Sequence, residues 1–235
     1  MHSKVMLMLT ALMGPCAINA PTMGPPLEPA ARLSVSVSDS VPVADRQAVQ
    51  EIVDSTLAVI GSAQFAANLG GLDGDYRMLW LSPYGERMAP ADVAQIYLGR
   101  HGGVRSVPTA VTVDYDEDTP WQGFDRGTPL SATITLTPKV LERWRGGTAE
   151  KRSCAVNTLA HELGHTFTSD PSRGEWVFAD GGKGKFPNLF YGHLASYTIG
   201  SVAQCTMLQR HDALQGTFTA CLRKWGTDRF NNGYC

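Results

Sequence analysis

The hydrophobic positions between residues 44 and 69 recur at steps of three and four residues. They are Val49, Ile52, Val53, Leu57 and Ile60. An α-helix places residues with this spacing on one face. We therefore predict one helix over residues 44–69, with Asp45 as a possible N-terminal cap, that packs behind the core.

Shorter elements follow along the chain. The pattern predicts strands over residues 76–81, 109–115 and 131–136, and short helices from Pro90 to Gly99 and from Thr137 to Trp144. An alternating segment at residues 33–38, LSVSVS, predicts a further strand at the edge of the sheet. This mixture of strands and helices predicts an α+β domain with a mixed sheet.

Two longer helices are predicted in the second half of the chain. The first is capped by Ser153 and has a buried stripe of Val156, Leu159, Ala160, Leu163 and Phe167. Because this stripe faces the core, we expect the side chains of His161, Glu162 and His165 to face a cleft. The last helix is predicted from about residue 189 to residue 208 and carries His193, Tyr197 and Cys205.

Length and charge place limits on the type of protein. A chain of 235 residues with 43% hydrophobic residues can bury one substantial core, so we expect one domain over residues 44–235, with a helical C-terminal part from about residue 186. The formal net charge of −2 indicates neither a basic surface for nucleic acid nor an acidic tail. We therefore expect no nucleic-acid partner.

Residues 1–20 have the pattern of a secretory signal peptide. Lys4 precedes a nine-residue apolar run over residues 5–13, Gly14 and Pro15 end the run, and Ala20 could precede the cleavage site. A bilayer-spanning helix needs about 20 residues, so this run is too short to be an anchor. A lipoprotein centred on Cys16 is the weaker alternative. We expect a secreted or periplasmic monomer with no membrane anchor after cleavage.

The next segment, residues 21–43, contains five prolines and is predicted to be a linker or a short pro-segment that ends in the edge strand. Removal of residues 1–20 leaves an even set of cysteines: Cys154, Cys205, Cys221 and Cys235. In an oxidising compartment such a set predicts two disulfides, and three pairings are possible.

The strongest chemical signal is the segment TLAHELGHTF at residues 158–167. His161 and His165 are four residues apart, so a helix places both imidazoles on one face, where they can bind one metal ion. Glu162 projects beside them and can hold a water, whose pKa a bound Zn²⁺ lowers to about 7. A chance match to this spacing is expected in roughly 1 of 200 chains of this composition. The alternative is an amphipathic core helix with two surface histidines.

The segment resembles the zinc-binding helix of the zincin metallopeptidases. The resemblance implies a zincin-like α+β fold, with a mixed twisted sheet whose edge strand lies beside the active-site helix. It implies that His161 and His165 bind Zn²⁺ and that Glu162 is the general base, which later returns the proton to the leaving amine. It also implies that the strand at residues 132–136 is the sheet edge onto which an extended substrate adds.

The third zinc ligand does not follow the metzincin pattern HExxHxxGxxH, because Thr168 and Pro171 occupy its glycine and last ligand positions. In gluzincin-like and compact zincins the third ligand comes from a later helix. This implies His193, with Asp170 or Asp180 as alternatives. The other histidines of the mature chain, His101 and His211, fit less well. Tyr197 or Tyr191 is a candidate to stabilise the oxyanion.

These observations predict a zinc-dependent peptidase that acts on proteins or peptides. A zinc hydrolase that acts on a non-peptide amide, such as a cell-wall crosslink, is one alternative. A zincin-shaped binding protein with a structural metal is another. Structural zinc sites usually fill all four positions with Cys and His, and a glutamate beside the first histidine has no use there.

Overall fold

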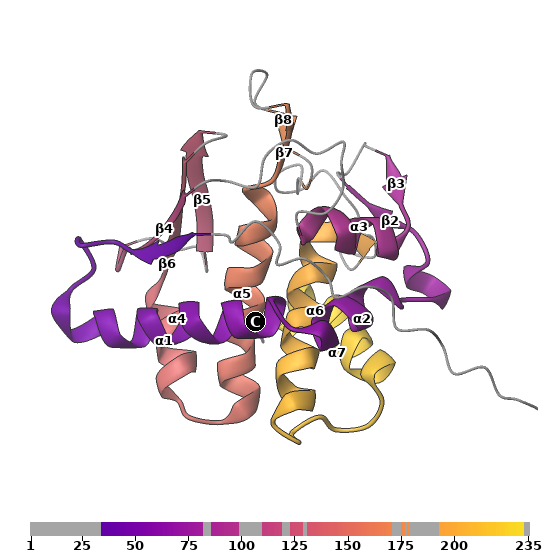
Figure 1. Cartoon of the computed structure of the whole chain (residues 1–235). Helices are drawn as coiled ribbons and strands as arrows, with labels where there is room; N and C mark the ends of the chain where they lie inside the picture. Colours follow the sequence, from indigo (N-terminus) through magenta and orange to yellow (C-terminus); the bar gives the residue numbers. More distant parts are fainter. Residues whose placement is uncertain are drawn as a thin grey trace, which may run out of the picture.

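The computed structural model describes residues 34–81, 86–98, 110–118, 123–128, 131–170, 175–176, 178 and 193–232. The predicted signal peptide and most of the proline-rich segment lie outside these residues, as do His101, Asp180 and Tyr191. The described part is a mixed α+β structure with seven α-helices and a small, mainly parallel sheet (Figure 1). The α+β prediction is confirmed at this level.

The sheet has four strands in the order β1 (Val35–Val37), β4 (Ala110–Tyr115), β6 (Ser131–Leu136) and β5 (Gly123–Thr128). The first three strands are parallel, and β5 is antiparallel to β6. The strands predicted at residues 33–38, 109–115 and 131–136 are therefore confirmed. Val111 and Val113 of β4 are buried, as are Ala132, Ile134 and Leu136 of β6, as expected for a sheet covered by helices.

The predicted place of one strand in the sheet is wrong. The strand at residues 131–136 was expected at the edge, but β6 lies between β4 and β5. The edges are β1, as predicted for residues 33–38, and β5, which comes from a segment that the sequence pattern did not predict to be a strand. Its register pairs Gly123 with Leu136 and Thr128 with Ser131, so β5 and β6 form a hairpin over their full length.

Two small antiparallel ladders complete the strands. They are β2 (Leu79–Trp80) with β3 (Arg87–Met88), and β7 (Thr168–Asp170) with β8 (Glu175–Trp176). The strand predicted over residues 76–81 is thus shorter than expected, because a 3₁₀ turn occupies Gly74–Tyr76.

The single helix predicted over residues 44–69 is two helices, α1 (Val43–Ile60) and α2 (Ala63–Gly70). The chain breaks at Gly61, and the Ser62 hydroxyl accepts a hydrogen bond from the Phe65 backbone N–H at 3.1 Å, which starts α2. Asp45 lies in the first turn of α1, but Pro42 occupies the N-cap position. In the described part of the chain no single helix has the length and hydropathy to cross a membrane; α1 and α2, bent by 62°, pass that test only as a pair.

Both proline-initiated helices are confirmed as α3 (Pro90–Tyr97) and α4 (Pro138–Arg145). In each case proline occupies the first turn of the helix. A backbone N–H there has no partner within the helix, so the missing N–H of proline costs no hydrogen bond.

The three remaining helices are α5 (Ala149–His165), α6 (Ala195–Arg210) and α7 (Phe218–Asn232). The cap predicted at Ser153 is wrong, because α5 begins four residues earlier and the Thr148 hydroxyl accepts from the Lys151 N–H at 3.2 Å. The start predicted for the last long helix is also wrong. His193 precedes α6 and does not lie on it.

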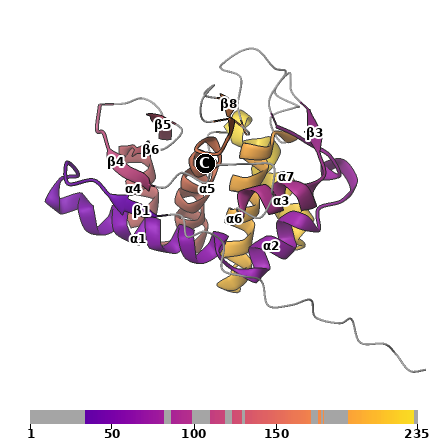
Figure 2. The same ribbon diagram turned by 45° about the horizontal axis from the view of Figure 1, so that its top comes forward.

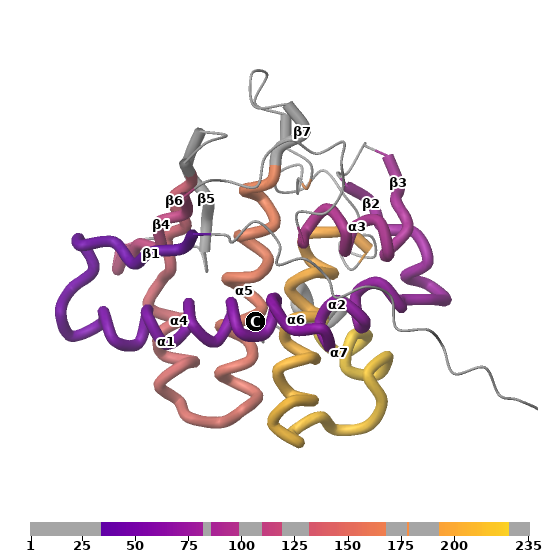
Figure 3. Tube along the Cα trace, viewed as in Figure 1, coloured from indigo at the N-terminus to yellow at the C-terminus, as the bar shows by residue number. Residues whose placement is uncertain are grey.

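Helix α5 lies at the centre of the molecule. The sheet and α4 lie on one side of it and α6 and α7 on the other, while α1 runs across α4 and α5 (Figures 1 and 2). The tube view shows α5 and α6 side by side and antiparallel (Figure 3). The Cys205–Cys221 disulfide joins α6 to α7.

Candidate metal centre

The C-terminal half of α5 brings His161, Glu162 and His165 together. Their candidate ligand atoms all lie within 4.8 Å of one another. The two histidine Nε2 atoms are 3.1 Å apart, and Glu162 Oε1 lies 3.9 Å from His161 Nε2. Zinc–nitrogen bonds of about 2.0–2.1 Å in a tetrahedral site separate two nitrogen ligands by about 3.4 Å. The imidazoles are thus close to the spacing that one shared ion requires.

A backbone carbonyl fixes the orientation of the His165 ring. His165 Nδ1 lies 2.8 Å from the Phe178 carbonyl oxygen. A carbonyl oxygen only accepts, so Nδ1 carries a proton and donates it, and Nε2 faces His161. Metal-binding histidines commonly have this kind of second contact. Phe178 is fully buried and packs against Phe167, with ring centroids 6.1 Å apart.

The predicted buried stripe of α5 is confirmed in full: Val156, Leu159, Ala160, Leu163 and Phe167 are all buried. His161 and Glu162 are also buried, with 4% and 7% of their surface exposed. Both side chains are therefore less exposed to solvent than we predicted for residues that face a cleft. Coulombic interactions of a charge on either residue are stronger in such surroundings than in water.

Tyr197, predicted as a catalytic residue, lies next to His161. Its ring centroid is 4.4 Å from that of His161, and the rings are tilted by 56°. Tyr197 belongs to the first turn of α6, and this helix lies on the other side of α5 from the sheet (Figure 1). The structure thus brings Tyr197 to the metal group. Its role in the reaction stays a prediction.

His193, predicted as the third ligand, is not brought into the group of His161, Glu162 and His165. Its ring packs against Tyr76 instead, with centroids 5.1 Å apart. Asp170 belongs to β7, but its side chain lies outside the described part of the structure, and Asp180 lies outside it altogether. The identity of the third ligand therefore stays a prediction.

Tyr97 of α3 contacts α5 close to the candidate metal group. Its hydroxyl donates to the carbonyl oxygen of Ala160, the residue before His161, at 2.9 Å, and its ring stacks on Phe167 at 5.1 Å. Burial raises the pKa of the Tyr97 phenol far above its ordinary value, so the hydroxyl stays protonated and remains a donor. The sequence gives no signal for this contact, because its partners are 63 residues apart.

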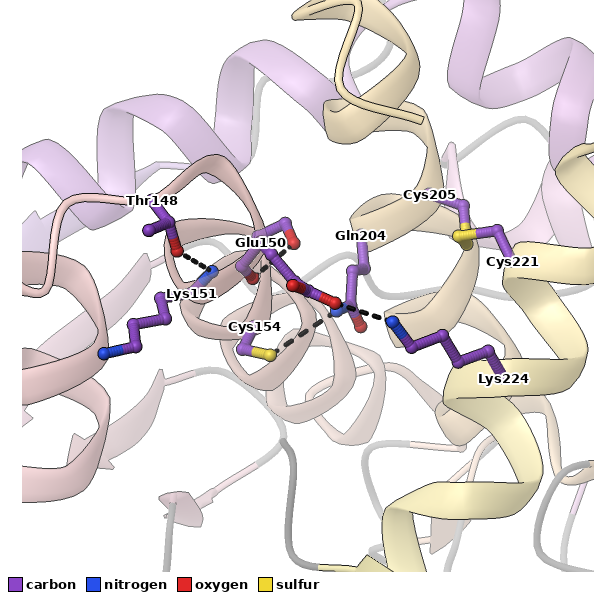
Figure 4. A network of polar contacts seen from close by, with 9 residues as sticks. Thr148, Glu150, Lys151, Cys154, Gln204, Cys205, Cys221 and Lys224 are labelled. Atoms are coloured by element: carbon purple, nitrogen blue, oxygen red, sulfur yellow. Dashed lines mark hydrogen bonds and ion pairs between the residues drawn. A yellow bond between two sulfur atoms is a disulfide. The ribbon is translucent and has the colours of Figure 1, made fainter. Parts of the chain in front are cut away.

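A buried polar chain connects α5 to α6 on the N-terminal side of the site. Asn157 Nδ2 donates to Gln204 Oε1 at 2.6 Å, and Gln204 Nε2 lies 3.4 Å from Cys154 Sγ. Figure 4 shows the contact of Gln204 with Cys154 together with the Glu150–Lys224 ion pair and the Cys205–Cys221 disulfide. Cys154 is disulfide-bonded as well.

His161, Glu162 and His165 form a group that could hold a metal ion. Two imidazoles and a carboxylate suit zinc and similar divalent ions. Cys154, Cys205 and Cys221 are all in disulfides and offer no thiolate to a metal. Within the described residues the group therefore lacks the cysteine ligands that are typical of structural zinc sites.

Comparisons with known proteins add no relative. No protein-family model matches the chain, and searches of curated proteins and of solved structures found no significant match.

Proposed function

We propose that this chain is a zinc-dependent peptidase with a zincin-like active site on α5. The observation that carries the proposal is the convergence of His161 Nε2 and His165 Nε2 to 3.1 Å with Glu162 beside them. The Phe178 carbonyl supports it, because it accepts from His165 Nδ1 and so turns the Nε2 atom of that ring toward His161. A pair of histidines that served only to pack a helix would not need this orientation.

In the proposed reaction, His161 and His165 hold Zn²⁺ through Nε2. When bound, zinc polarises the substrate carbonyl and makes a water molecule acidic enough to act as a nucleophile near neutral pH. The Glu162 carboxylate accepts the proton from the attacking water and later gives it to the leaving amine nitrogen. In this proposal the Tyr197 phenol, whose ring contacts that of His161, donates a hydrogen bond to the developing oxyanion.

The substrate-binding strand is assigned to β5 in place of the predicted strand 132–136. In the described part of the chain β5 pairs only with β6, and α5 packs against both strands. An extended peptide can add to such an edge through backbone hydrogen bonds. We propose that a protein or peptide substrate binds along β5 with its scissile bond toward α5.

The third zinc ligand is proposed to be His193, whose ring packs against Tyr76 in this structure. Zinc content of the His193→Ala, Asp170→Ala and Asp180→Ala variants distinguishes the candidates. Loss of zinc only in His193→Ala supports this assignment. Retention of zinc in His193→Ala together with its loss in one aspartate variant moves the ligand to that aspartate.

We further propose that the protein is secreted or periplasmic. The Cys205–Cys221 disulfide is consistent with this location, because disulfides persist in oxidising compartments.

The proposed function is tested with the purified mature chain. Its metal content is measured by mass spectrometry, and its activity is measured on a peptide library with and without 1,10-phenanthroline, followed by addition of Zn²⁺. We expect cleavage that the chelator abolishes and zinc restores. Hydrolysis of cell-wall crosslinks without peptide cleavage would identify the amide-hydrolase alternative, and bound metal without any hydrolysis would indicate a binding protein.

A further inference from the structure

Helices α5 and α6 each have a glycine that faces the other helix. Gly164 of α5 faces Ser196 of α6, and a Cβ built on Gly164 would meet the Ser196 Cα at 3.8 Å, which is ordinary van der Waals contact. Gly200 of α6 faces the part of α5 one turn further toward its N-terminus. The contact at Gly200 includes His161, and the contact at Gly164 lies beyond it toward the C-terminus of α5.

The contact at Gly200 has no room for a side chain. A Cβ there would lie 2.5 Å from Asn157 Oδ1, 2.9 Å from the Asn157 carbonyl oxygen and 3.2 Å from the Cβ of His161. The second of these atoms belongs to the backbone and cannot rotate away. Any larger residue at position 200 must push α6 away from α5 or displace Asn157 and His161.

A buried hydrogen bond fixes the position of α6 along α5. Asn157 and Gln204 are both fully buried, and the bond between their amides is 2.6 Å long. In this antiparallel pair Gly200 lies one turn before Gln204, and Tyr197 lies three residues before Gly200. The register that joins Asn157 to Gln204 is therefore the register that places the Tyr197 ring 4.4 Å from that of His161.

We propose that Gly200 is a positioning residue of the active site, and that the Asn157–Gln204 pair shares this role. By allowing the two backbones to touch, Gly200 sets how far Tyr197 stands from the metal ligand His161. Gly200 itself does not contact substrate or metal and acts through these two residues. This inference rests on the proposed function for its effect on catalysis, whereas the effect on ring geometry does not depend on it.

The first measurement needs neither metal nor substrate. In the metal-free protein, the ring current of Tyr197 shifts the NMR signals of the His161 ring protons, because the two ring centroids are 4.4 Å apart. We expect Gly200→Ala to shift these signals. Gly70→Ala is the matched control, because a Cβ on this helical glycine would meet only ordinary contacts, at 3.7 Å from Ala91 and 3.9 Å from Ala94. Unchanged His161 signals in folded Gly200→Ala would overturn the proposal.

The second measurement is a double-mutant cycle on peptide hydrolysis. Misplacement by about 1 Å can lower a catalytic rate about 100-fold, so we expect a fall of that order in kcat/KM for Gly200→Ala. If Gly200 acts through Tyr197, then Tyr197→Phe should lower kcat/KM in the wild-type background but have little further effect in Gly200→Ala. Equal factors in both backgrounds would contradict the proposal.

A variant that adds no atoms covers the case in which Gly200→Ala does not fold. Asn157→Ala removes the bond to Gln204 while leaving space at the contact. We expect it to shift the His161 signals in the metal-free protein and to lower kcat/KM in the same direction. Wild-type values for both would overturn the role of the α5–α6 register. If the variants shift the His161 signals as expected but the wild-type protein hydrolyses no peptide, the proposed function alone is contradicted.

Discussion

His165 is constrained at both of its ring nitrogens. Nδ1 donates to the Phe178 carbonyl at 2.8 Å, and Nε2 faces the Nε2 of His161 at 3.1 Å. The Phe178 contact comes from backbone, so a side-chain substitution at Phe178 does not delete the acceptor. If His161 and His165 bind a metal as proposed, the affinity depends on the position of Phe178 as well as on the histidines.

A carboxyl group on α1 allows a prediction about pH. The indole N–H of Trp144 donates to Glu51 Oε2 at 2.9 Å, and Gln47 Nε2 donates to Oε1 at 3.0 Å. The Trp144 bond is the main cause that lowers the pKa of Glu51, with Gln47 second. The ionised Glu51 carboxylate therefore stabilises the folded state. This contribution is fully present above the ordinary pKa of a glutamate, about 4.3, and is lost as the pH falls through the lower pKa of the folded state.

We therefore expect Trp144→Phe to raise the pKa of Glu51 toward its ordinary value, as measured by carboxyl-carbon NMR titration. Gln47→Ala should raise it less, because it removes the smaller of the two hydrogen-bond contributions. A Glu51 pKa that is unchanged in Trp144→Phe would show that the indole does not stabilise the carboxylate.

At the scale of elements, the N-terminal cap of α5 allows a prediction about stability. The exposed Thr148 hydroxyl caps α5 by accepting from the Lys151 N–H, so Thr148→Ala should lower the free energy of unfolding by about 1 kcal/mol. Urea denaturation measures this change. Thr148→Ser, which keeps the hydroxyl, is the control and should stay near wild type. Equal stability of the alanine and serine variants would rule out the cap.

The elements that could be predicted have local signals. Pro90 and Pro138 mark the starts of α3 and α4, and β-branched residues mark β4 and β6. The spacing of His161 and His165 was enough to predict that they meet, because a helix fixes the geometry of residues four apart.

The elements that were missed depend on contacts distant in sequence or on competing local signals. Strand β5 has the sequence GFDRGT, which lacks a β-branched run, and it is a strand because it pairs with β6. Residues 44–69 have a continuous apolar pattern, yet Gly61 and the Ser62 cap divide them. His193 was expected on a helix, but the last long helix begins only at Ala195.

At the scale of the whole molecule, the disulfide closes the helical C-terminal part. Cys205 and Cys221 are 16 residues apart, and closing a loop of this size stabilises a fold by about 3 kcal/mol in the chain-entropy model. We expect the Cys205→Ala/Cys221→Ala double variant to melt at a lower temperature than wild type in non-reducing buffer. The two proteins should differ much less after reduction with dithiothreitol.

Thiol titration of the denatured, non-reduced mature chain checks the same claim chemically. It should find no free thiol among Cys154, Cys205, Cys221 and Cys235. Reaction at Cys205 or Cys221 would contradict the disulfide and remove its support for an oxidising compartment.

The central claim is that the group on α5 binds zinc and hydrolyses peptides with Glu162 as the base. The most direct test is the Glu162→Gln variant, which keeps the size of the side chain and removes its basicity. We expect peptide hydrolysis to fall by about 10²–10⁴-fold while zinc stays at about one ion per chain, because His161 and His165 remain. Hydrolysis at the wild-type rate in a Glu162→Gln protein that retains its zinc would contradict the account.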